Sequence, residues 1–145
     1  MKVSSLLSGK EAGVITISPD ETLHAASTLL TTHNIGAVVA VDAEGLPVGI
    51  LSERDIIHAI AAHGTAALEQ PVSTVMTTQL IIAVPDDELA YLSSTMTAKR
   101  IRHLPVMQGD NLIGMVSIGD LVKAQRDHFE GEARAYERYI TGGLA

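Results

Sequence analysis

The sequence predicts an α+β fold in which two copies of one β-α-β-β-α unit pack sheet against sheet, followed by a C-terminal helical extension. The first observation is an internal repeat: Val14–Leu23 aligns with Leu80–Leu89, and Ile35–Val39 with Ile101–Pro105, both at an offset of 66 residues. The second is that a polar, glycine-containing turn separates two apolar runs in each copy. Because each predicted sheet is too small to bury its own face, we expect the two to cover one another.

The first copy is assigned to residues 1–63. A β-branched run over 14–17 is followed by Ser18, Pro19 and Glu21, a pattern typical of a capping box with proline at a first helical position. It predicts a helix over 21–33. Apolar runs predict strands over 36–41 and 46–51, and the unit closes with a helix over 53–62.

The second copy is assigned to 72–125, after a linker over 64–71. The repeat predicts a strand over 80–84, a helix over 86–99, strands over 103–107 and 111–116, and a helix from about 118. A short segment precedes the first strand of each copy, and these two leaders, residues 3–7 and 72–76, also correspond in sequence.

Residues 126–145 are predicted to extend the last helix. Its apolar positions recur at helical spacing, so we expect that face to pack against another surface. This surface belongs to a second copy of the chain, to the module itself, or to a different protein. Gly131 is a candidate bend, and Gly142–Gly143 a helix end. The stripe consists of Phe129, Ala133, Tyr136 and Ile140.

Composition excludes several classes of function. There is no cysteine, which rules out disulfides, thiolate zinc sites and thiol nucleophiles. A net charge of −7 and a pI near 5.2 argue against nucleic acid as a partner. No apolar run is long enough to span a bilayer, so we expect a cytoplasmic protein without a membrane partner. The six histidines show no metal-ligating spacing and no catalytic motif is present, so neither a metal site nor an enzyme is expected.

One motif occurs twice: glycine, two apolar residues, serine, two variable residues and aspartate, over Gly49–Asp55 and Gly114–Asp120. With the repeat spacing and Leu104-Pro105-Val106, the chain resembles tandem cystathionine-β-synthase (CBS) domains, the pair called a Bateman module, over nearly its whole length. The resemblance implies a homodimer and an adenosyl ligand, which is AMP, ADP, ATP, S-adenosylmethionine or NAD(H).

The motif suggests how such a ligand binds. The backbone amides and the positive dipole end at a helix start suit a phosphate, and the hydroxyl of Ser52 or Ser117 can add a donor there. The carboxylate of Asp55 or Asp120, one helical turn along, can accept hydrogen bonds from ribose hydroxyls. A capping box alone explains the same pattern. Arg54, Arg102 and His103 are the other phosphate candidates, although cations at a helix end also merely complement its dipole. The adenine pocket is expected among Val14, Thr16, Ile17, Leu80, Ile81, Ala83, Ile101, Leu104 and Pro105.

The function predicted is therefore a regulatory module that senses an adenine nucleotide in the cleft between repeats and signals by changing conformation to an unidentified regulated protein. Two alternatives stay open. One is a structural or interaction dimer with no physiological ligand, and the other is a sensor of NAD(H) or S-adenosylmethionine.

Overall fold

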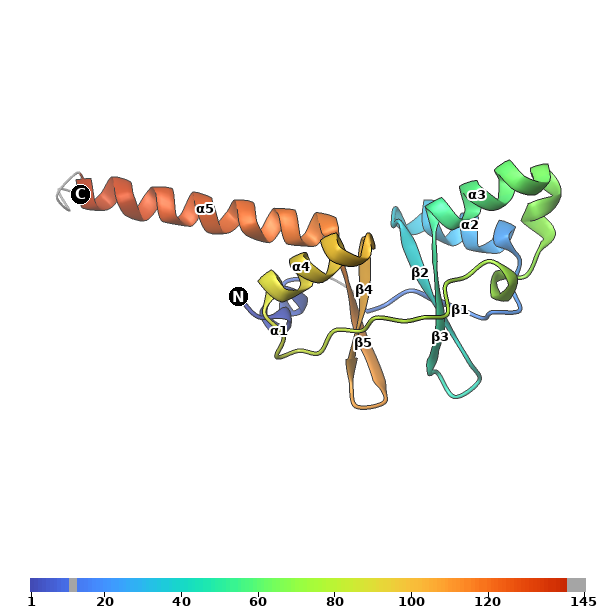
Figure 1. The fold of residues 1–145 in the computed structure, drawn as a ribbon. Helices are drawn as coiled ribbons and strands as arrows, with labels where there is room; N and C mark the ends of the chain where they lie inside the picture. The colour runs from blue at the N-terminus through green and yellow to red at the C-terminus, as the bar shows by residue number, and fades with distance from the viewer. Residues whose placement is uncertain (11–12, 141–145) are drawn as a thin grey trace.

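The computed structural model describes residues 1–10 and 13–140 and has the α+β architecture expected, with two lobes side by side and one long helix extending away from them (Figure 1). The helices and strands in chain order are α1 (Val3–Ser8), β1 (Thr16–Ile17), α2 (Leu23–His33), β2 (Ala37–Val41), β3 (Pro47–Ser52), α3 (Glu53–His63), η1 (Gly64–Glu69), η2 (Val72–Thr74), α4 (Leu89–Lys99), β4 (His103–Gln108), β5 (Asn111–Ser117) and α5 (Ile118–Ile140).

The first lobe contains a three-stranded sheet with the order β1-β2-β3. β1 runs parallel to β2, and β2 pairs antiparallel with β3 through the hairpin that the sequence predicts. The central strand is almost wholly buried from Ala37 to Ala40, because it lies between two partners and under the helices. The second lobe repeats the hairpin as β4 and β5.

The predicted capping box at Ser18 is wrong. The Ser18 hydroxyl accepts from the Asp20 amide at 3.2 Å in a turn. The helix begins two residues later than expected, where the Thr22 hydroxyl accepts from the Ala25 amide at 3.1 Å. The turn over 18–21 competes with the helix for the same backbone groups, and Thr22 is the residue left in extended conformation to cap α2.

The predicted strand over 80–84 is also wrong. Only Ala83 pairs with the sheet, through a parallel bridge to Val106, its amide donating to the Pro105 carbonyl at 2.8 Å. Pro85 follows, and the Val84 amide donates a hydrogen bond to the Asp87 carboxylate at 2.9 Å, so the segment forms a turn instead of an extended strand. For the same reason the next helix starts at Leu89 and not at 86.

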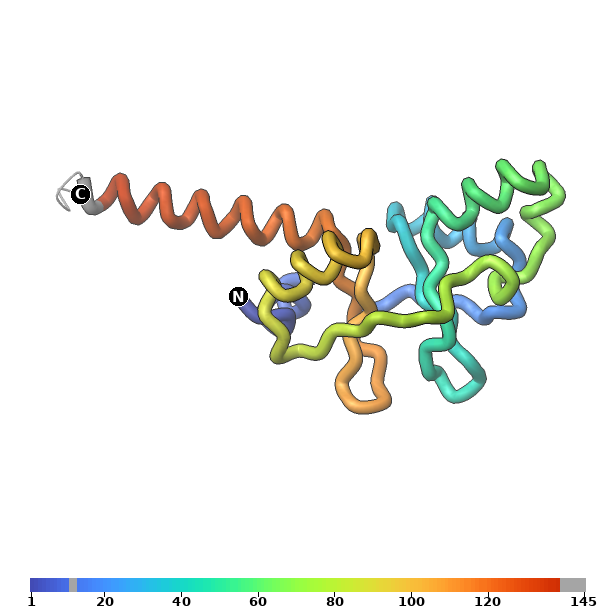
Figure 2. Tube along the Cα trace, in the orientation of Figure 1, coloured from blue at the N-terminus to red at the C-terminus, as the bar shows by residue number. Residues whose placement is uncertain are grey.

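Each leader lies on the lobe formed by the other copy, and the chain that follows residues 72–76 passes from the first lobe to the second (Figure 2). Leader 3–7 packs on the second lobe, where Val3 is fully buried, and leader 72–76 packs on the first, where Val72 is fully buried. The motif glycines are explained by this exchange: a Cβ on Gly49 would overlap Met76, and one on Gly114 would lie 2.6 Å from a Leu7 methyl. These glycines are therefore needed for packing, because each leaves room for a side chain from the leader of the other repeat.

The segment 64–71, expected as a linker, is largely the 3-10 helix η1, and Ala67 within it is fully buried in the first core. α5 is one continuous helix through Gly131, so that glycine does not end it. Leu121 anchors α5 in the second core, whereas Phe129 and Tyr136 are 57% and 70% exposed. The Ile140 side chain and Gly142–Gly143 lie outside what the structure describes. Within the described chain no helix is both long and apolar enough to cross a membrane.

Candidate functional site

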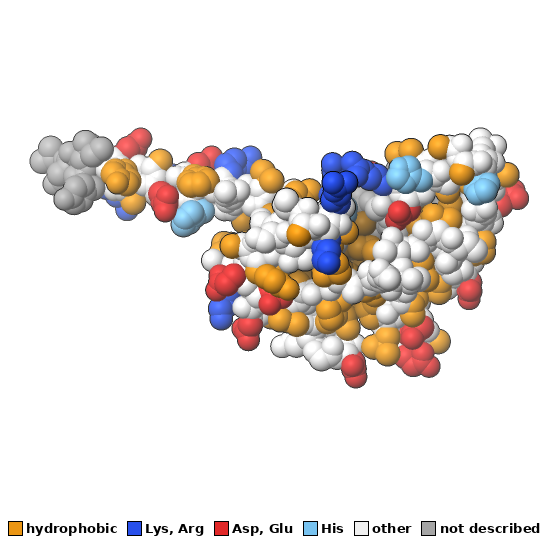
Figure 3. Space-filling view, viewed as in Figure 1, with side chains coloured by type: hydrophobic (Ala, Val, Ile, Leu, Met, Phe, Trp, Pro, Cys, Tyr) orange, Lys and Arg blue, Asp and Glu red, His pale blue; other side chains and the backbone are white. Residues whose placement is uncertain are grey.

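A cavity of about 250 Å³ lies between the lobes and draws residues from both. The first lobe contributes Gly36, Ala37, Ile50 and the start of α3, and the second contributes the segment before β4 together with residues 79–81. Lys and Arg side chains gather at the upper end of the boundary between the lobes, with hydrophobic side chains below them (Figure 3). The cavity thus joins an apolar wall to a basic edge.

The structure brings together the predicted residues of one motif copy but not of the other. Those that line the cavity are Ser52, Arg54, Asp55, Leu80, Ile81, Ile101, Arg102, His103 and Pro105. The remaining predicted residues do not line it: Ile17, Ala83 and Leu104 are buried in the cores, and Val14, Thr16, Ser117 and Asp120 lie elsewhere. Thr16 and Ile17 belong to β1, which pairs with β2 within the first lobe.

The motif at the start of α3 forms a complete capping box. The Ser52 amide donates to Asp55 Oδ2 at 2.9 Å, and the Asp55 amide donates to Ser52 Oγ at 3.2 Å. The Glu53 amide donates to the Gly36 carbonyl at 2.9 Å. Protein groups therefore take backbone donors that the sequence suggested for phosphate. Asp55 nevertheless lines the cavity, and the capping box uses only one of its two carboxylate oxygens.

The same box in the second copy has an additional partner. Asp120 Oδ2 accepts from the Ser117 amide at 2.8 Å and also from Lys10 Nζ at 2.8 Å, and Lys10 donates to the Met115 carbonyl as well. Burial alone would raise the pKa of Asp120, but the hydrogen bonds from Lys10 and Ser117 and the lysine charge outweigh it and lower that pKa. Lys10 thus pairs with the carboxylate that was expected to accept from a ribose at this copy.

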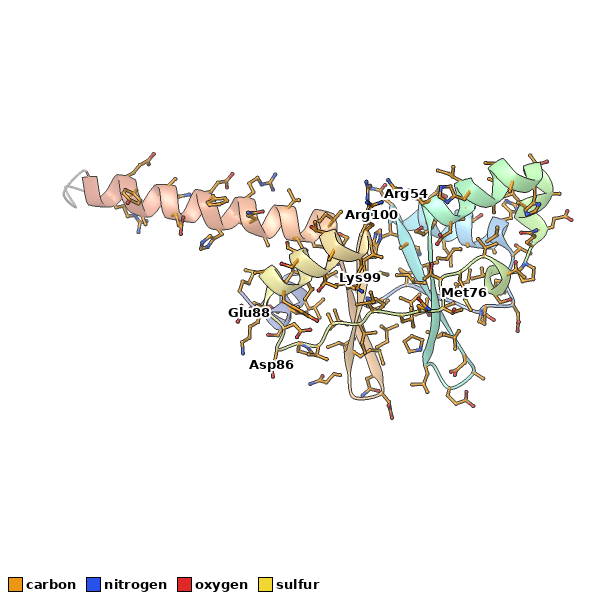
Figure 4. The ribbon with its side chains drawn as sticks, in the orientation of Figure 1. Arg54, Met76, Asp86, Glu88, Lys99 and Arg100 are labelled. Carbon is orange, nitrogen blue, oxygen red and sulfur yellow. The ribbon has the colours of Figure 1, made fainter. Side chains whose placement is uncertain are left out.

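Three arginines line the cavity: Arg54 from α3, Arg100 at the end of α4, and Arg102 before β4. Figure 4 shows Arg54 and Arg100 approaching one another across the boundary between the lobes. Arg100 was not among the residues expected from the sequence, and it has a left-handed backbone with φ 55°. Its counterpart at the repeat offset, Asn34, has φ 52°. The repeat alignment held the missing signal, because an arginine stands where the first copy has a typical left-handed residue.

His103 lies on the cavity wall against the first lobe. Gly36 lets it approach, since a Cβ there would lie 3.2 Å from His103 Nε2. Burial lowers the pKa of His103 below 6.5, opposed by the charges of Glu53 and Asp120 and assisted by those of Arg102 and Lys10. The imidazole is therefore mainly neutral at pH 7 and can donate or accept a hydrogen bond without adding a full charge.

Two copies of one unit that share a cavity define an internally duplicated, cleft-forming module. The family model "CBS domain" matches residues 10–62 and 72–127, and the chain belongs to the CBS-domain family. Its similarity to known members covers most of each chain. "CBS domain-containing protein YhcV" of Bacillus subtilis (strain 168) is 37% identical over 123 residues, which are 85% of this chain and 86% of that protein.

Two solved structures have the same fold. The CBS-domain containing protein ATU1752 from Agrobacterium tumefaciens has a TM-score of 0.83 at 41% identity, covering 86% of this chain and 92% of that one. The CBS domain pair of protein MJ0100, in complex with 5-methylthioadenosine and S-adenosyl-L-methionine, has a TM-score of 0.77 at 26% identity and covers 91% and 98%. Such pairs are regulatory modules, and the second shows that an adenosyl ligand binds to one of them.

Proposed function

We propose that the chain is a regulatory sensor that binds an adenine nucleotide in the cavity between its repeats and has no catalytic activity of its own. One observation carries this proposal: the same cavity joins an apolar wall, a carboxylate one helical turn from a serine, and a cluster of arginines. These groups match the base, the ribose and the phosphate of a nucleotide in that order. The adenosyl ligands of the related MJ0100 pair support the assignment.

In the proposed complex, the adenine lies against Leu80, Ile81, Ile101 and Pro105. Asp55 accepts from the ribose hydroxyls with the oxygen that its capping box does not use. The Ser52 hydroxyl can donate to phosphate while its oxygen continues to accept from the Asp55 amide. Capping and ligand binding are thus compatible at this motif.

The second motif copy is proposed to bind no nucleotide while Lys10 occupies it. A ligand there would have to displace an ammonium group that donates to both Asp120 and the Met115 carbonyl at 2.8 Å. The salt bridge is partly exposed, with 38% and 24% of the two side chains accessible, but a ligand that displaced the ammonium group would break both of its hydrogen bonds. We therefore expect one nucleotide per chain.

The signal is proposed to be a change in the angle between the lobes. The cavity walls come from both repeats, so a ligand that contacts both favours one relative orientation and shifts the population towards it. No catalytic group is proposed to act on the ligand, so the output passes to another protein. The exposed face of α5, including Phe129 and Tyr136, is the surface proposed for homodimer formation.

Thermal unfolding of the ligand-free protein with a panel of ligands tests the proposal. The panel is AMP, ADP, ATP, NADH and S-adenosylmethionine, each compared with the matching guanine nucleotide where one exists. A ligand present at 100 times its dissociation constant should stabilise the fold by about 2.7 kcal/mol and raise the midpoint by several degrees. No shift with any adenosyl compound would favour the alternative, an interaction dimer that uses its uncovered α5 face and has no physiological ligand.

A further inference from the structure

We infer that the cavity selects a nucleoside diphosphate or triphosphate over a nucleoside monophosphate and over S-adenosylmethionine, an inference that rests on the proposed function. The chain contains six arginines in 145 residues, and three of them, Arg54, Arg100 and Arg102, line this one cavity. Arg100 and Arg102 are two residues apart in the sequence, and the fold brings Arg54 to them from the other lobe. The rest of the chain is acidic enough to give a net charge of −7.

No ion pair within residues 1–10 and 13–140 neutralises these three side chains. The two carboxylates that also line the cavity belong to Glu53 and Asp55, and Asp55 is held by the Ser52 amide. Guanidinium groups never lose their charge in proteins, so three of them around one cavity repel one another until an anion binds. Their arrangement is therefore best explained by an anionic ligand.

The conformation of Arg100 is an independent argument. A non-glycine residue with a left-handed backbone costs free energy, and asparagine tolerates it better than arginine does. The first repeat has Asn34 at this position, and the second has Arg100 in nearly the same conformation. A strained residue that is not the natural choice for its backbone indicates a role beyond structure. Here that role is to present a third guanidinium group to the cavity.

The number of arginines sets the class of ligand. A phosphate monoester carries about −1.5 to −2 charge at pH 7, so three guanidinium groups are matched better by the larger negative charge of a diphosphate or triphosphate. All three side chains are exposed at the edge of the cavity, which encloses only about 250 Å³. The nucleoside therefore occupies the enclosed part, and the phosphate chain extends along the basic edge. S-adenosylmethionine carries a sulfonium cation, which this edge repels.

Isothermal titration calorimetry with adenosine, AMP, ADP, ATP, GTP and S-adenosylmethionine tests this, in buffer with EDTA so that free magnesium does not compete. ADP or ATP should bind at least about tenfold tighter than AMP, and their affinity should fall more steeply with salt concentration. Arg100→Gln should weaken ATP about tenfold or more and AMP much less. Arg126→Gln is the matched control, because it removes the same charge from α5, away from the cavity, and should change neither affinity.

Each outcome has one meaning. If AMP binds as tightly as ATP, or Arg100→Gln weakens AMP and ATP equally, the inference is wrong while the proposed function stands. If S-adenosylmethionine binds best, the inference is also wrong. If GTP binds as well as ATP, adenine recognition fails but selection by phosphate number survives. If none of the six compounds binds, both the proposed function and this inference are wrong.

Discussion

Replacing Arg100 by glycine should stabilise the ligand-free protein while weakening nucleotide binding. Arg100 caps α4 with φ 55° and ψ 42°, the left-handed conformation that glycine adopts without cost. The strain on an L-residue there is about 1–2 kcal/mol. Glycine loses about 0.4–1 kcal/mol of this gain, because it also makes the unfolded chain more flexible. The net gain is about 0–1.6 kcal/mol, with relief of repulsion from Arg54 and Arg102 adding to it.

Thermal and urea unfolding without nucleotide measure this gain. For a chain of 145 residues it corresponds to a rise in the midpoint of up to roughly 6 °C. Asn34→Gly is the matched control at the equivalent helix end, and it should gain less because asparagine already tolerates the conformation. If Arg100→Gly unfolds below the wild-type temperature, or gains no more than Asn34→Gly, then Arg100 is not strained and that part of the argument is refuted.

Three further predictions concern other sites. Lys10→Met should lower the free energy of unfolding by about 1 kcal/mol or less at pH 7. Because the pKa of Asp120 lies below 3.8 in the folded protein, the difference in stability between the variant and the wild type should vanish as the pH falls through that lowered pKa. A difference that stays constant with pH would contradict this prediction. His103→Gln should remove a loss of stability that the wild type shows below about pH 6.5, where the unfolded chain takes up the proton first, and an unchanged pH profile would contradict that reasoning. Truncation after Asp127 should convert a dimer to a monomer in sedimentation, and a truncated chain that still dimerises would exclude α5 as the interface.

The repeat made much of the fold predictable. The internal repeat identified both hairpins and the helices around them, because apolar strands and glycine turns are strong local signals. The errors at Ser18 and at 80–84 share a cause. In both places a local side-chain hydrogen bond, from the Asp20 amide to Ser18 and from the Val84 amide to Asp87, competes with regular structure, and periodicity does not detect such bonds.

The site was harder to predict than the fold, because pseudo-symmetry suggests two equal positions. Ser52 and Asp55 line the cavity, whereas Asp120 is joined to Lys10, which precedes it by 110 residues. That contact depends on the exchange of leaders between lobes. The motif glycines gave an indirect sign of the exchange, since Gly49 and Gly114 make room for Met76 and Leu7, but only the structure shows which leader reaches which lobe. Arg100 was missed because its role depends on a backbone angle.

The central claim is that an adenine nucleotide binds in the cavity at Asp55. Calorimetric titration of ATP into the paired variants Asp55→Asn and Asp120→Asn tests it most directly, because both substitutions alter the same capping position while only Asp55 lines the cavity. Asp55→Asn should weaken binding at least tenfold, whereas Asp120→Asn should leave it within about twofold of the wild type. Equal affinity in the two variants, or a larger loss in Asp120→Asn, would contradict it.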